Sequence, residues 1–560
     1  MDGSPEGTRN ESEYVSKYEI QLSFPAVVLK AVSDENASGT VEAQGGSSST
    51  TSGAATSGPQ KSAPKTNNEL IQMRLLEAGV QFETPVSLGE TVERLDAFCQ
   101  DLERTGCFNR VAVELGGGGG GNTTTNEQGQ QVMEQTVNVL LDEKNWYRLH
   151  LGGGVKAQEL LQQPEMSEQG PVPIAAELEA TAGIRNLAGV LDQSSIAYRL
   201  DTKGIASWTL LHERPFYTFL PSPWREAVLE TATGSRFALT AKAALDTLDY
   251  EYTRSYREYQ RLVSLHLSNQ HSLHDNPLAA ALTPDWYASL SWSFMLRDIV
   301  PRRQANSPWL SAASPSILQE AGPSLKHSIS ALVRTNGTFL EEGDPVLNPT
   351  NGWQAFAQAE VATPPGDVQF GKIQAGAACH VPLTSSLSLH WLGQAGWLKP
   401  LSWITSDNNK KPLPPTVSDR FHIGGPLQIP GFLPAGIGPR DTRTGSADSL
   451  VPGGDSVGGD LYYRTSLMAS IPALTAVFPD GRAFGFLAAG TCVQQANLWT
   501  ASNKDPVASF FGSTRASIGV GFVTTAMAGS RLEVTYAWPL RYAPVDARRN
   551  FQLGIGVSLN

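Results

Sequence analysis

From residue 146 to residue 560 the chain is a succession of strand-like segments with almost no helical periodicity. In the segment 286–296, WYASLSWSFML, apolar side chains recur at every second position, as at Leu290, Trp292 and Phe294. About sixteen strands are expected. Their approximate spans are 146–155, 173–186, 194–202, 205–213, 236–246, 258–269, 285–299, 324–335, 352–362, 367–382, 384–399, 457–471, 482–495, 515–525, 530–541 and 549–559. Such a region predicts an antiparallel β fold: a sandwich, a propeller or a barrel.

A long connection at about 400–456 separates the eleventh and twelfth of these segments. Its centre, RFHIGGPLQIPGFLPAGIGPR at 420–440, is too rich in glycine and proline for a regular strand or helix. Sandwiches and propellers rarely carry so long a connection, and long loops in compact folds are usually functional or disordered. This connection is therefore expected to be either functional or disordered.

The composition admits a barrel that spans a membrane. Charged residues make up only 17% of the chain, and no apolar run reaches about 18 residues, so no transmembrane helix is expected. A membrane protein with this sequence must therefore be a β-barrel, because only helices and closed barrels satisfy their backbone polar groups in lipid. The net charge of −12 argues against a nucleic-acid partner.

Residues 19–145 predict a small α+β domain ahead of the strand-rich region. The expected order is strand, helix, helix, strand, strand, and Thr66 with Glu69 fits a capping box at the start of the first helix. Residues 1–18 are expected to be disordered, and residues 33–66 form a low-complexity insertion rich in Ser, Thr and Gly. A free strand edge in this domain would suit an extended client that docks by β-augmentation.

No motif in the chain predicts covalent catalysis, a metal site or a cofactor. The four cysteines, Cys99, Cys107, Cys379 and Cys492, lack CxxC or zinc spacing and are expected to be free thiols. The glycine run 116–121 is not followed by Lys-Ser or Lys-Thr, so it is not a phosphate loop. We therefore expect that the protein is not an enzyme, while a soluble all-β enzyme or binding protein remains an open alternative.

Several segments resemble the outer-membrane barrel-assembly superfamily. The segment 423–432 is similar to that superfamily's inward-folded sixth loop, whose core reads Val/Ile-Arg-Gly-Phe/Tyr. The resemblance implies a functional loop with these core residues: Gly424, Gly425, Ile429, Pro430, Gly431 and Phe432. Gly106, Phe108 and Val111 match the Gly-x-Phe-x-x-Val signature of its POTRA (polypeptide-transport-associated) domain. Further matches are ELEATAGIRNLAG at 177–189, SVGGDLYY at 456–463 and the penultimate hairpin at 515–539. The resemblance implies an all-β transmembrane barrel of about sixteen antiparallel strands after one POTRA-like domain, with the sixth loop folded inward.

Within this superfamily the chain most resembles the barrel subunit of the mitochondrial sorting and assembly machinery. That likeness implies insertion and assembly of β-barrel precursors in the mitochondrial outer membrane, with these precursors, the machinery's other subunits and membrane lipids as partners. The N-terminus, MDGSPEGTRNESEY, lacks the regions of a secretory signal and the arginines of a transit peptide, which favours a mitochondrial barrel over a bacterial one. Two alternatives remain open: a passive porin-like channel, and a polypeptide-translocating pore of the plastid envelope.

The first and last expected strands suggest a weak seam in the barrel. The last strand fits the superfamily's β-signal, in which a polar residue is followed by glycine and then by two hydrophobic residues. Consecutive glycines weaken the first strand by about 0.5–1 kcal/mol each relative to alanine. We hypothesise a lateral gate that opens between these strands and exposes an edge to an incoming strand. The gate residues are Gly152, Gly153, Gly154, Gln552, Gly554, Val557 and Leu559.

The loop core departs from the superfamily at one position. Pro430 stands where the superfamily has arginine, and Ala488 stands where the thirteenth strand normally carries the partner of that arginine. Losing both is physically consistent, because a lone buried charge is costly. The alternative anchors are the packing of Phe432 and Ile429, or the nearby charges of Arg440 and Asp460. The sequence leaves open whether the departure alters the activity.

Overall fold

The computed structural model divides into two compact units. The first contains residues 1–148, 183–194 and 213–237, and the second contains 149–182, 195–212 and 238–560. The residues that the structure describes are 21–23, 27–31, 65–80, 86–116, 123–125, 131–134, 136–155, 176–202, 204–220, 237–269, 285–304, 307–337, 350–401, 415–444, 453–498, 505–526 and 530–557. The predicted disordered segment 1–18, most of the insertion 33–66 and Leu559 lie outside these residues.

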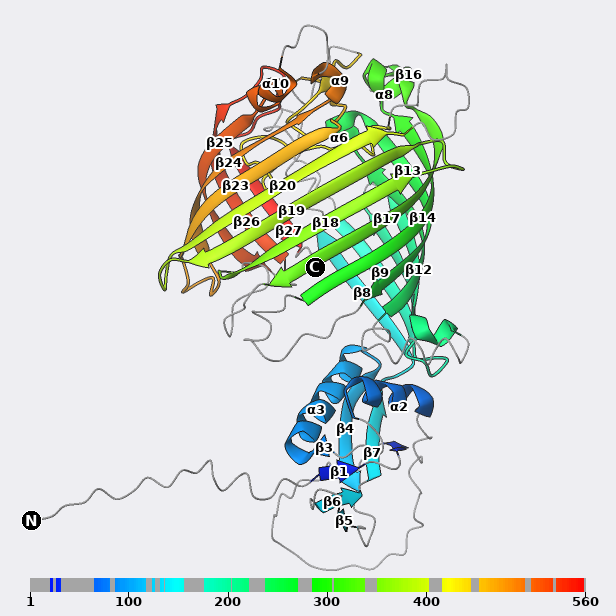
Figure 1. Ribbon diagram of the computed structural model, residues 1–560. Coiled ribbons are helices and arrows are strands. Elements are labelled where there is room, and N and C mark those ends of the chain that lie inside the picture. Colours follow the sequence, from blue (N-terminus) through cyan, green and yellow to red (C-terminus); the bar gives the residue numbers. More distant parts are fainter. Residues whose placement is uncertain are drawn as a thin grey trace, which may run out of the picture. The chain divides into compact units, whose positions relative to one another are not determined.

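The first unit contains a small α+β domain (Figure 1). Its described elements are β1 (Gln21–Ser23), β2 (Val27–Ala31), α2 (Asn68–Glu77), β3 (Val86–Ser87), α3 (Leu88–Arg104), β4 (Phe108–Gly116), β5 (Thr123–Thr125), β6 (Gln131–Glu134) and β7 (Thr136–Glu143). Strand β7 lies between β2, which is parallel to it, and β4, which is antiparallel. Helices α2 and α3 pack on this sheet through a buried core that includes Leu75, Phe98 and Val139. The prediction of a small α+β domain is confirmed.

The start of helix α2 differs from the predicted capping box. Asn67 is the N-cap residue, and its side chain accepts a hydrogen bond from the backbone N–H of Glu69. Thr66 is buried, where its hydroxyl donates to the Glu143 carboxylate at 2.6 Å and accepts from the side-chain amide of Asn186 at 2.8 Å. The predicted capping role of Thr66 is wrong, because tertiary hydrogen bonds within the first unit engage its hydroxyl instead.

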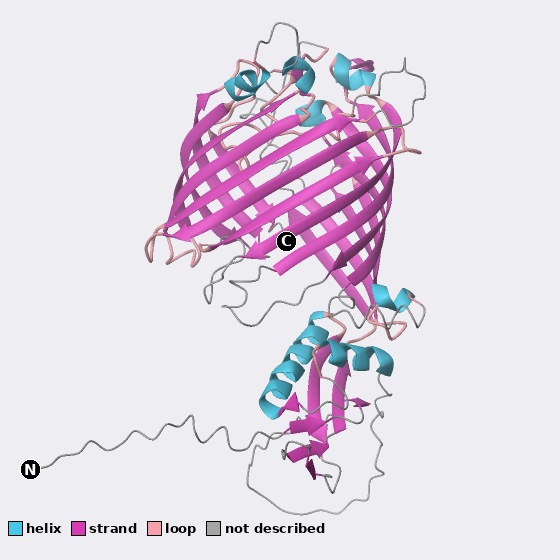
Figure 2. Ribbon diagram, in the orientation of Figure 1, coloured by secondary structure: helices cyan, strands magenta, loops and turns pink. Residues whose placement is uncertain are grey.

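The second unit is built around one sixteen-stranded antiparallel sheet that curves into a barrel (Figures 1 and 2). The strands follow one another in the sheet in chain order, from β8 at one edge to β27 at the other. They are β8 (Tyr147–Val155), β9 (Ala176–Arg185), β10 (Gln193–Asp201), β11 (Ala206–Pro215), β12 (Phe237–Asp249), β13 (Tyr256–Asn269), β14 (Asp285–Pro301), β17 (Gly322–Gly337), β18 (Gly352–Ala362), β19 (Phe370–Pro382), β20 (Ser388–Pro400), β23 (Leu461–Pro472), β24 (Arg482–Val493), β25 (Arg515–Ala526), β26 (Ser530–Arg541) and β27 (Phe551–Val557). The predicted fold class is confirmed.

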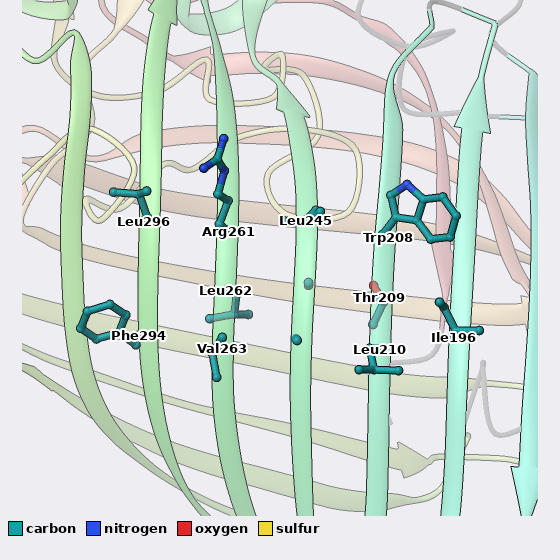
Figure 3. A pocket seen from close by; sticks show the side chains of 12 residues that line it. Ile196, Trp208, Thr209, Leu210, Leu245, Arg261, Leu262, Val263, Phe294 and Leu296 are labelled. Atoms are coloured by element: carbon teal, nitrogen blue, oxygen red, sulfur yellow. The ribbon is translucent and has the colours of Figure 1, made fainter.

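The two faces of the barrel wall carry different side chains. On β14, Leu290 and Phe294 are exposed on the outer surface, whereas Arg297, on the inward register of the same strand, is 2% exposed. Trp208 of β11 and Val263 of β13 add to the same outward apolar surface (Figure 3). Apolar side chains on the outside and polar side chains on the inside are the pattern of a barrel embedded in lipid. In the described part of the chain, no helix is both long enough and apolar enough to cross a membrane.

Short elements gather at one end of the barrel (Figure 1). They include the helices α6 (Glu251–Arg254), α8 (Pro315–Gln319), α9 (Gln495–Leu498) and α10 (Pro506–Gly512), and strand β16 (Ser307–Ser311), which pairs with β15 (Arg303–Gln304). The connection between β20 and β23 contains a further strand pair, β21 (Arg440–Asp441) with β22 (Asp455–Ser456). The 3-10 helix η2 (Phe216–Phe219) belongs to the first unit. The connection between β20 and β23 is the predicted functional loop.

Candidate functional site

Residues 415–444, which we call the lumen loop, pack against inward-facing side chains of the barrel wall. The loop contributes its apolar residues to one buried cluster: Phe421, Ile423, Ile429, Phe432 and Ile437. Strands β19, β20, β23, β24 and β26 contribute Phe370, Leu398, Tyr462, Phe484, Phe486, Ala488 and Ala537. Because its contacts come from inward-facing side chains of five strands of the curved sheet, the lumen loop lies inside the barrel.

Glycine conformations shape the loop core. Gly424 and Gly425 have φ angles of +118° and +105°, and Gly431 has +94°, a region that residues with a side chain rarely adopt. A Cβ on Gly424 would lie 2.5 Å from the carbonyl oxygen of Leu433. The backbone N–H of Gly425 donates to the carbonyl oxygen of Phe432 at 2.9 Å and closes the core into a compact turn. All six predicted core residues are buried in this turn.

The loop core is hydrogen-bonded to the last part of the chain. Backbone N–H···O bonds of 2.8–3.1 Å join residues 431–436 to residues 547–549. Gln552 of β27 adds its side-chain amide: Oε1 accepts from the N–H of Gly431 at 2.9 Å, and Nε2 donates to the carbonyl oxygen of Phe432 at 2.8 Å. The predicted loop core and the predicted polar residue of the β-signal are therefore in direct contact.

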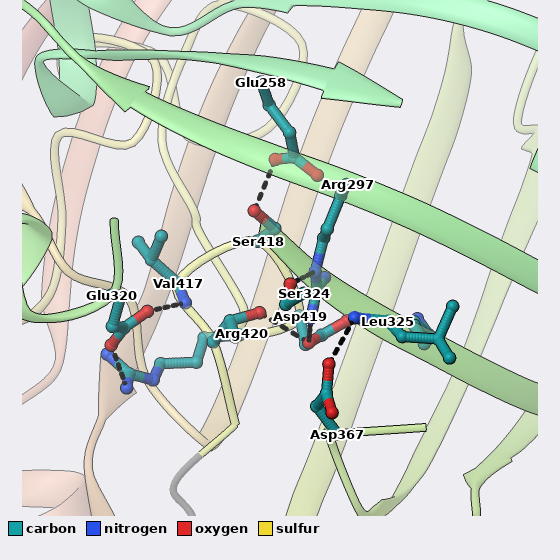
Figure 4. A network of polar contacts seen from close by, with 12 residues as sticks. Glu258, Arg297, Glu320, Ser324, Leu325, Asp367, Val417, Ser418, Asp419 and Arg420 are labelled. Atoms are coloured by element: carbon teal, nitrogen blue, oxygen red, sulfur yellow. Dashed lines mark hydrogen bonds and ion pairs between the residues drawn. The ribbon is translucent and has the colours of Figure 1, made fainter. Parts of the chain in front are cut away.

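A charged network holds the N-terminal part of the lumen loop (Figure 4). The Asp419 carboxylate lies 2.7 Å from Nη2 of Arg297 and 3.0 Å from Nζ of Lys326. Lys326 also pairs with Glu360 at 2.7 Å, and Nζ of Lys372 donates to the backbone oxygen of Asp419 at 2.8 Å. The side chains of Arg297 and Asp419 are each 2% exposed. Side chains of β14, β17 and β19 thus converge on Asp419, and Glu360 of β18 joins the network through Lys326.

The neighbours of Asp419 are anchored as well. The Ser418 hydroxyl donates to the carboxylate of Glu258 on β13. Arg420 pairs at 2.7 Å with Glu320, which follows helix α8. Three consecutive loop residues therefore bind three separate parts of the barrel, as Figure 4 shows.

The network keeps Asp419 ionised. Burial alone raises the pKa of its carboxyl, but the charges of Lys326 and Arg297 outweigh this effect and hold the pKa of Asp419 well below its usual range. Burial lowers the pKa of His422 well below its ordinary value, and the neutral ring donates from Nε2 to the carbonyl oxygen of Val417 at 2.9 Å. Neither side chain changes charge near neutral pH, so the anchoring of the lumen loop stays constant there.

Sequence patterns did not identify this network, although one signal for it exists. Arg297, Lys326 and Lys372 each occupy the register that alternates with exposed apolar positions on their strands, as Lys372 does beside Ile373. A charged residue on this register faces the lumen and needs a partner there. Strand periodicity does not identify Asp419 as this partner, because it does not encode the path by which the loop enters the barrel.

The predicted gate residues lie on the two edge strands of the sheet. Residues 152–154 belong to β8, and Gln552, Gly554 and Val557 belong to β27. Among the described residues, no hydrogen-bonded register joins β8 to β27. Gln552 and Gly554 both face the lumen loop, since a Cβ on Gly554 would lie 3.0 Å from Cδ2 of Leu427. The structure thus brings two of the predicted gate residues to the loop core.

A family model decides the assignment of this fold. The model of the Omp85 superfamily domain matches residues 222–559, more than half of the chain. The chain belongs to the Omp85 superfamily. The match includes the lumen loop and all strands from β12 to β27.

Two fungal proteins and one solved structure are similar to this Omp85 chain. A SAM50-like protein of Schizosaccharomyces pombe is 31% identical over 254 residues, 44% of this chain and 47% of that protein. The sorting assembly machinery 50 kDa subunit of Saccharomyces cerevisiae is 24% identical over 292 residues, 51% of this chain and 53% of that protein. The chain thus spans about half the length of the curated relatives it matches. BamA from Haemophilus ducreyi lacking POTRA domains 1–3 shares the fold, with a TM-score of 0.57 at 15% identity over 88% of this chain and 82% of that one.

At the position where the superfamily has arginine, this Omp85 chain has a buried proline, so packing rather than an ion pair holds the loop core there. Pro430 and Ala488 are both buried, and Ala488 lies in the apolar cluster of the lumen loop. Arg440 donates to the carbonyl oxygens of Ala435 and Gly454, and Asp460 accepts from the backbone N–H of Gln495. In the described structure these two charges bind backbone groups, while the ion pairs between loop and wall lie elsewhere in the lumen loop.

A close contact between loop core and wall lies at Gly490 of β24. A Cβ there would lie 2.6 Å from the carbonyl oxygen of Tyr463 and 2.7 Å from Cδ1 of Ile429. We expect Gly490→Ala to lower the free energy of unfolding by about 1–3 kcal/mol, as overpacking typically does. Gly485→Ala on the same strand is the control, since its nearest neighbour would be the carbonyl oxygen of Gly519 at 3.9 Å. Equal urea midpoints of the two variants, folded in detergent micelles, would contradict this packing.

Proposed function

We propose that this protein inserts and assembles β-barrel precursors in the mitochondrial outer membrane. Membership of the Omp85 superfamily and partial matches to the SAM50-like fungal proteins support the proposal. The observation that carries it is the lumen loop bound to β27, an edge strand of the sheet. A loop that occupies the lumen and binds an edge strand can control whether that edge is free to pair with the strand of a precursor.

The proposed mechanism is a lateral gate between β8 and β27. When these strands separate, each presents a row of unpaired backbone N–H and C=O groups. An incoming precursor strand pairs with this edge, because lipid cannot satisfy its backbone polar groups. The glycines at 152–154 favour opening, since glycine loses more backbone entropy than other residues when it is ordered in a strand. The step forms hydrogen bonds only, so the protein acts as a template rather than as an enzyme.

The proposed partners follow from the same assignment. The Saccharomyces cerevisiae relative is by name a subunit of a sorting assembly machinery. We therefore propose other subunits of such a machinery as partners, together with barrel precursors. Membrane lipid is the proposed contact of the outward apolar surface that includes Trp208, Leu245 and Phe294.

Depletion of the protein from cells tests the proposed function. In mitochondria isolated after depletion, newly imported barrel precursors are expected to reach the intermembrane space and to remain unassembled on blue-native gels. A helical outer-membrane protein imported in parallel is the control and should assemble normally. Re-expression of the chain should restore barrel assembly.

A porin-like channel makes the opposite prediction. It requires an open lumen, whereas the lumen loop is anchored to the wall by the Asp419 network and by the packing of Phe432. If depletion leaves barrel assembly intact and lowers only metabolite flux, the insertion proposal fails and the channel replaces it. Steady conductance of the purified protein without precursor would point the same way.

A further inference from the structure

The side chain of Gln552 joins two parts of the molecule that the proposed gate would move. Its Oε1 accepts from the N–H of Gly431 at 2.9 Å, and its Nε2 donates to the carbonyl oxygen of Phe432 at 2.8 Å. The residue is 5% exposed. It sits on β27, the last strand in the sheet order. One buried amide therefore connects the lumen loop to an edge strand.

The chemistry of this contact selects a primary amide. The backbone of Gly431–Phe432 offers one donor and one acceptor side by side, and an amide presents the matching acceptor and donor. Glutamate at 552 would set a second acceptor against the carbonyl oxygen of Phe432 when ionised. Leucine would leave a buried N–H and a buried C=O without partners, which is unfavourable.

The strand around Gln552 is shaped to the loop as well. The backbone N–H of Arg549 donates to the carbonyl oxygen of Gly431 at 3.1 Å. Two residues after Gln552, a Cβ on Gly554 would lie 3.0 Å from Cδ2 of Leu427, a tight contact that glycine avoids. Residues 549–554 therefore present one continuous face to the lumen loop, with the amide at its centre.

We propose that Gln552 is a latch between the lumen loop and the last strand. While the amide holds the Gly431–Phe432 backbone, β27 stays in place, and the strand leaves the seam only when this pair of hydrogen bonds breaks. Coupling of this kind is reciprocal. Displacing the loop loosens β27, and displacing β27 loosens the loop. The inference rests on the proposed gate, but it concerns the protein without a precursor and is measured separately from insertion.

Hydrogen–deuterium exchange of the full-length protein in lipid nanodiscs tests the latch. In Gln552→Leu, we expect exchange about tenfold faster at the amides of the loop core and of β26, which pairs with β27. Thr535→Val is the matched control. Thr535 lies opposite Gln552 in the β26–β27 register, and its hydroxyl contacts the backbone oxygen of Gln552 rather than the loop. The control should leave exchange in the loop core unchanged.

In Gln552→Glu, the pH decides whether the side chain at 552 can form both hydrogen bonds, so one variant tests both states. At about pH 7.5 the ionised carboxylate lacks the donor, so exchange should be fast in both regions. At about pH 4 the protonated carboxyl regains one donor and one acceptor, so exchange should return toward the wild-type rate measured at the same pH. This reversal separates the latch from a folding defect, because the chain is the same in both states.

Two results would overturn the latch. One is exchange in the loop core of Gln552→Leu at the wild-type rate. The other is faster exchange of β26 alone, with the loop core unaffected, since that would show the two parts to be uncoupled. Failure of the depletion experiment would remove the proposed insertion activity but would leave these exchange rates to be judged on their own.

Discussion

Asp419→Ala is expected to lower the free energy of unfolding of the barrel by about 3–5 kcal/mol, the usual effect of removing one partner of a buried ion pair. The Asp419 carboxylate neutralises Arg297 and Lys326, and its backbone oxygen accepts from Lys372. Arg297 is 2% exposed, so water cannot replace the lost carboxylate. In the variant, Arg297, Lys326 and Lys372 remain on the wall without the loop carboxylate. Carboxylates on the wall strands, such as Glu360, are then their only anionic neighbours in the described network.

The N-terminal part of the lumen loop is expected to detach from the barrel wall in the same variant. Asp419 is the point at which β14, β17 and β19 hold the N-terminal part of the lumen loop, and alanine removes both of its ion pairs. Trypsin should therefore cleave at Arg420, whose side chain is paired with Glu320 in the intact protein. Urea unfolding in detergent micelles gives the free energy, and limited proteolysis of the folded protein gives the exposure of the loop.

Asp367→Ala is the matched control for this prediction. Asp367 lies near the network, where its carboxylate accepts from the backbone N–H of Leu325 at 2.7 Å, but it is exposed and makes no buried ion pair in the described structure (Figure 4). We expect a loss of at most about 1 kcal/mol, typical of one hydrogen bond. If Asp419→Ala and Asp367→Ala lower stability equally, the charged network does not anchor the loop.

A double variant distinguishes the effect of an uncompensated buried charge from the effect of lost packing. Arg297→Met combined with Asp419→Leu removes both members of the closest pair and leaves an apolar contact of similar volume. Such replacements of buried ion pairs are often neutral. We expect the double variant to recover the part of the stability that the uncompensated Arg297 costs in Asp419→Ala, while Lys326 still lacks its Asp419 partner.

Strand periodicity predicted the barrel wall closely, because its signal is local. Strand β18 was expected at 352–362 and spans Gly352–Ala362, with exposed side chains at every second position apart from Ala355. The start of β20 was expected at 384 and lies at Ser388, since Thr384 and Leu387 form the turn before it. Leu387 is apolar and continues the alternation, so the pattern alone places it in the strand.

Strand periodicity does not predict contacts between segments that are distant in the sequence. The expected start of β23 at 457 lies at Leu461, because Val457 and Gly459 hydrogen-bond to the lumen loop, at Pro439 and Phe421. The Asp419 network joins residues that are 47 to 122 positions apart in the chain. Periodicity reports which face of a strand points inward, but it does not report which loop arrives there.

The two anchors of the lumen loop lie on different parts of the wall. The charged network binds strands β14 to β19, far in the sheet order from the seam, whereas Gln552 binds the loop core to β27 at the seam. Movement of β27 therefore requires release of the Gln552 contact and does not require release of Asp419. We therefore predict that a covalent bond between β8 and β27 blocks precursor assembly, even when the Asp419 network and the Gln552 contact are both intact.

A disulfide across the seam is expected to abolish precursor assembly. Leu149 and Leu151 of β8 are exposed on the outer surface, as is Phe551 of β27. In a variant without the four native cysteines, cysteine pairs that combine Leu149 or Leu151 with Phe551 would join the two edge strands from outside. Assembly of imported precursors should fall at least about tenfold in the oxidised protein and return after reduction, because a closed seam offers no free edge.

A disulfide between strands that already pair is the control for the seam. Tyr536 of β26 lies opposite Phe551 in the antiparallel register, and both are exposed on the outer surface. Tyr536→Cys with Phe551→Cys therefore adds the same kind of bond, shares one cysteine with the test pairs and leaves β8 free. This variant should assemble precursors at the wild-type rate whether oxidised or reduced. Full activity of an oxidised seam pair would show that precursors are assembled without separation of β8 from β27, and the lateral gate would have to be abandoned.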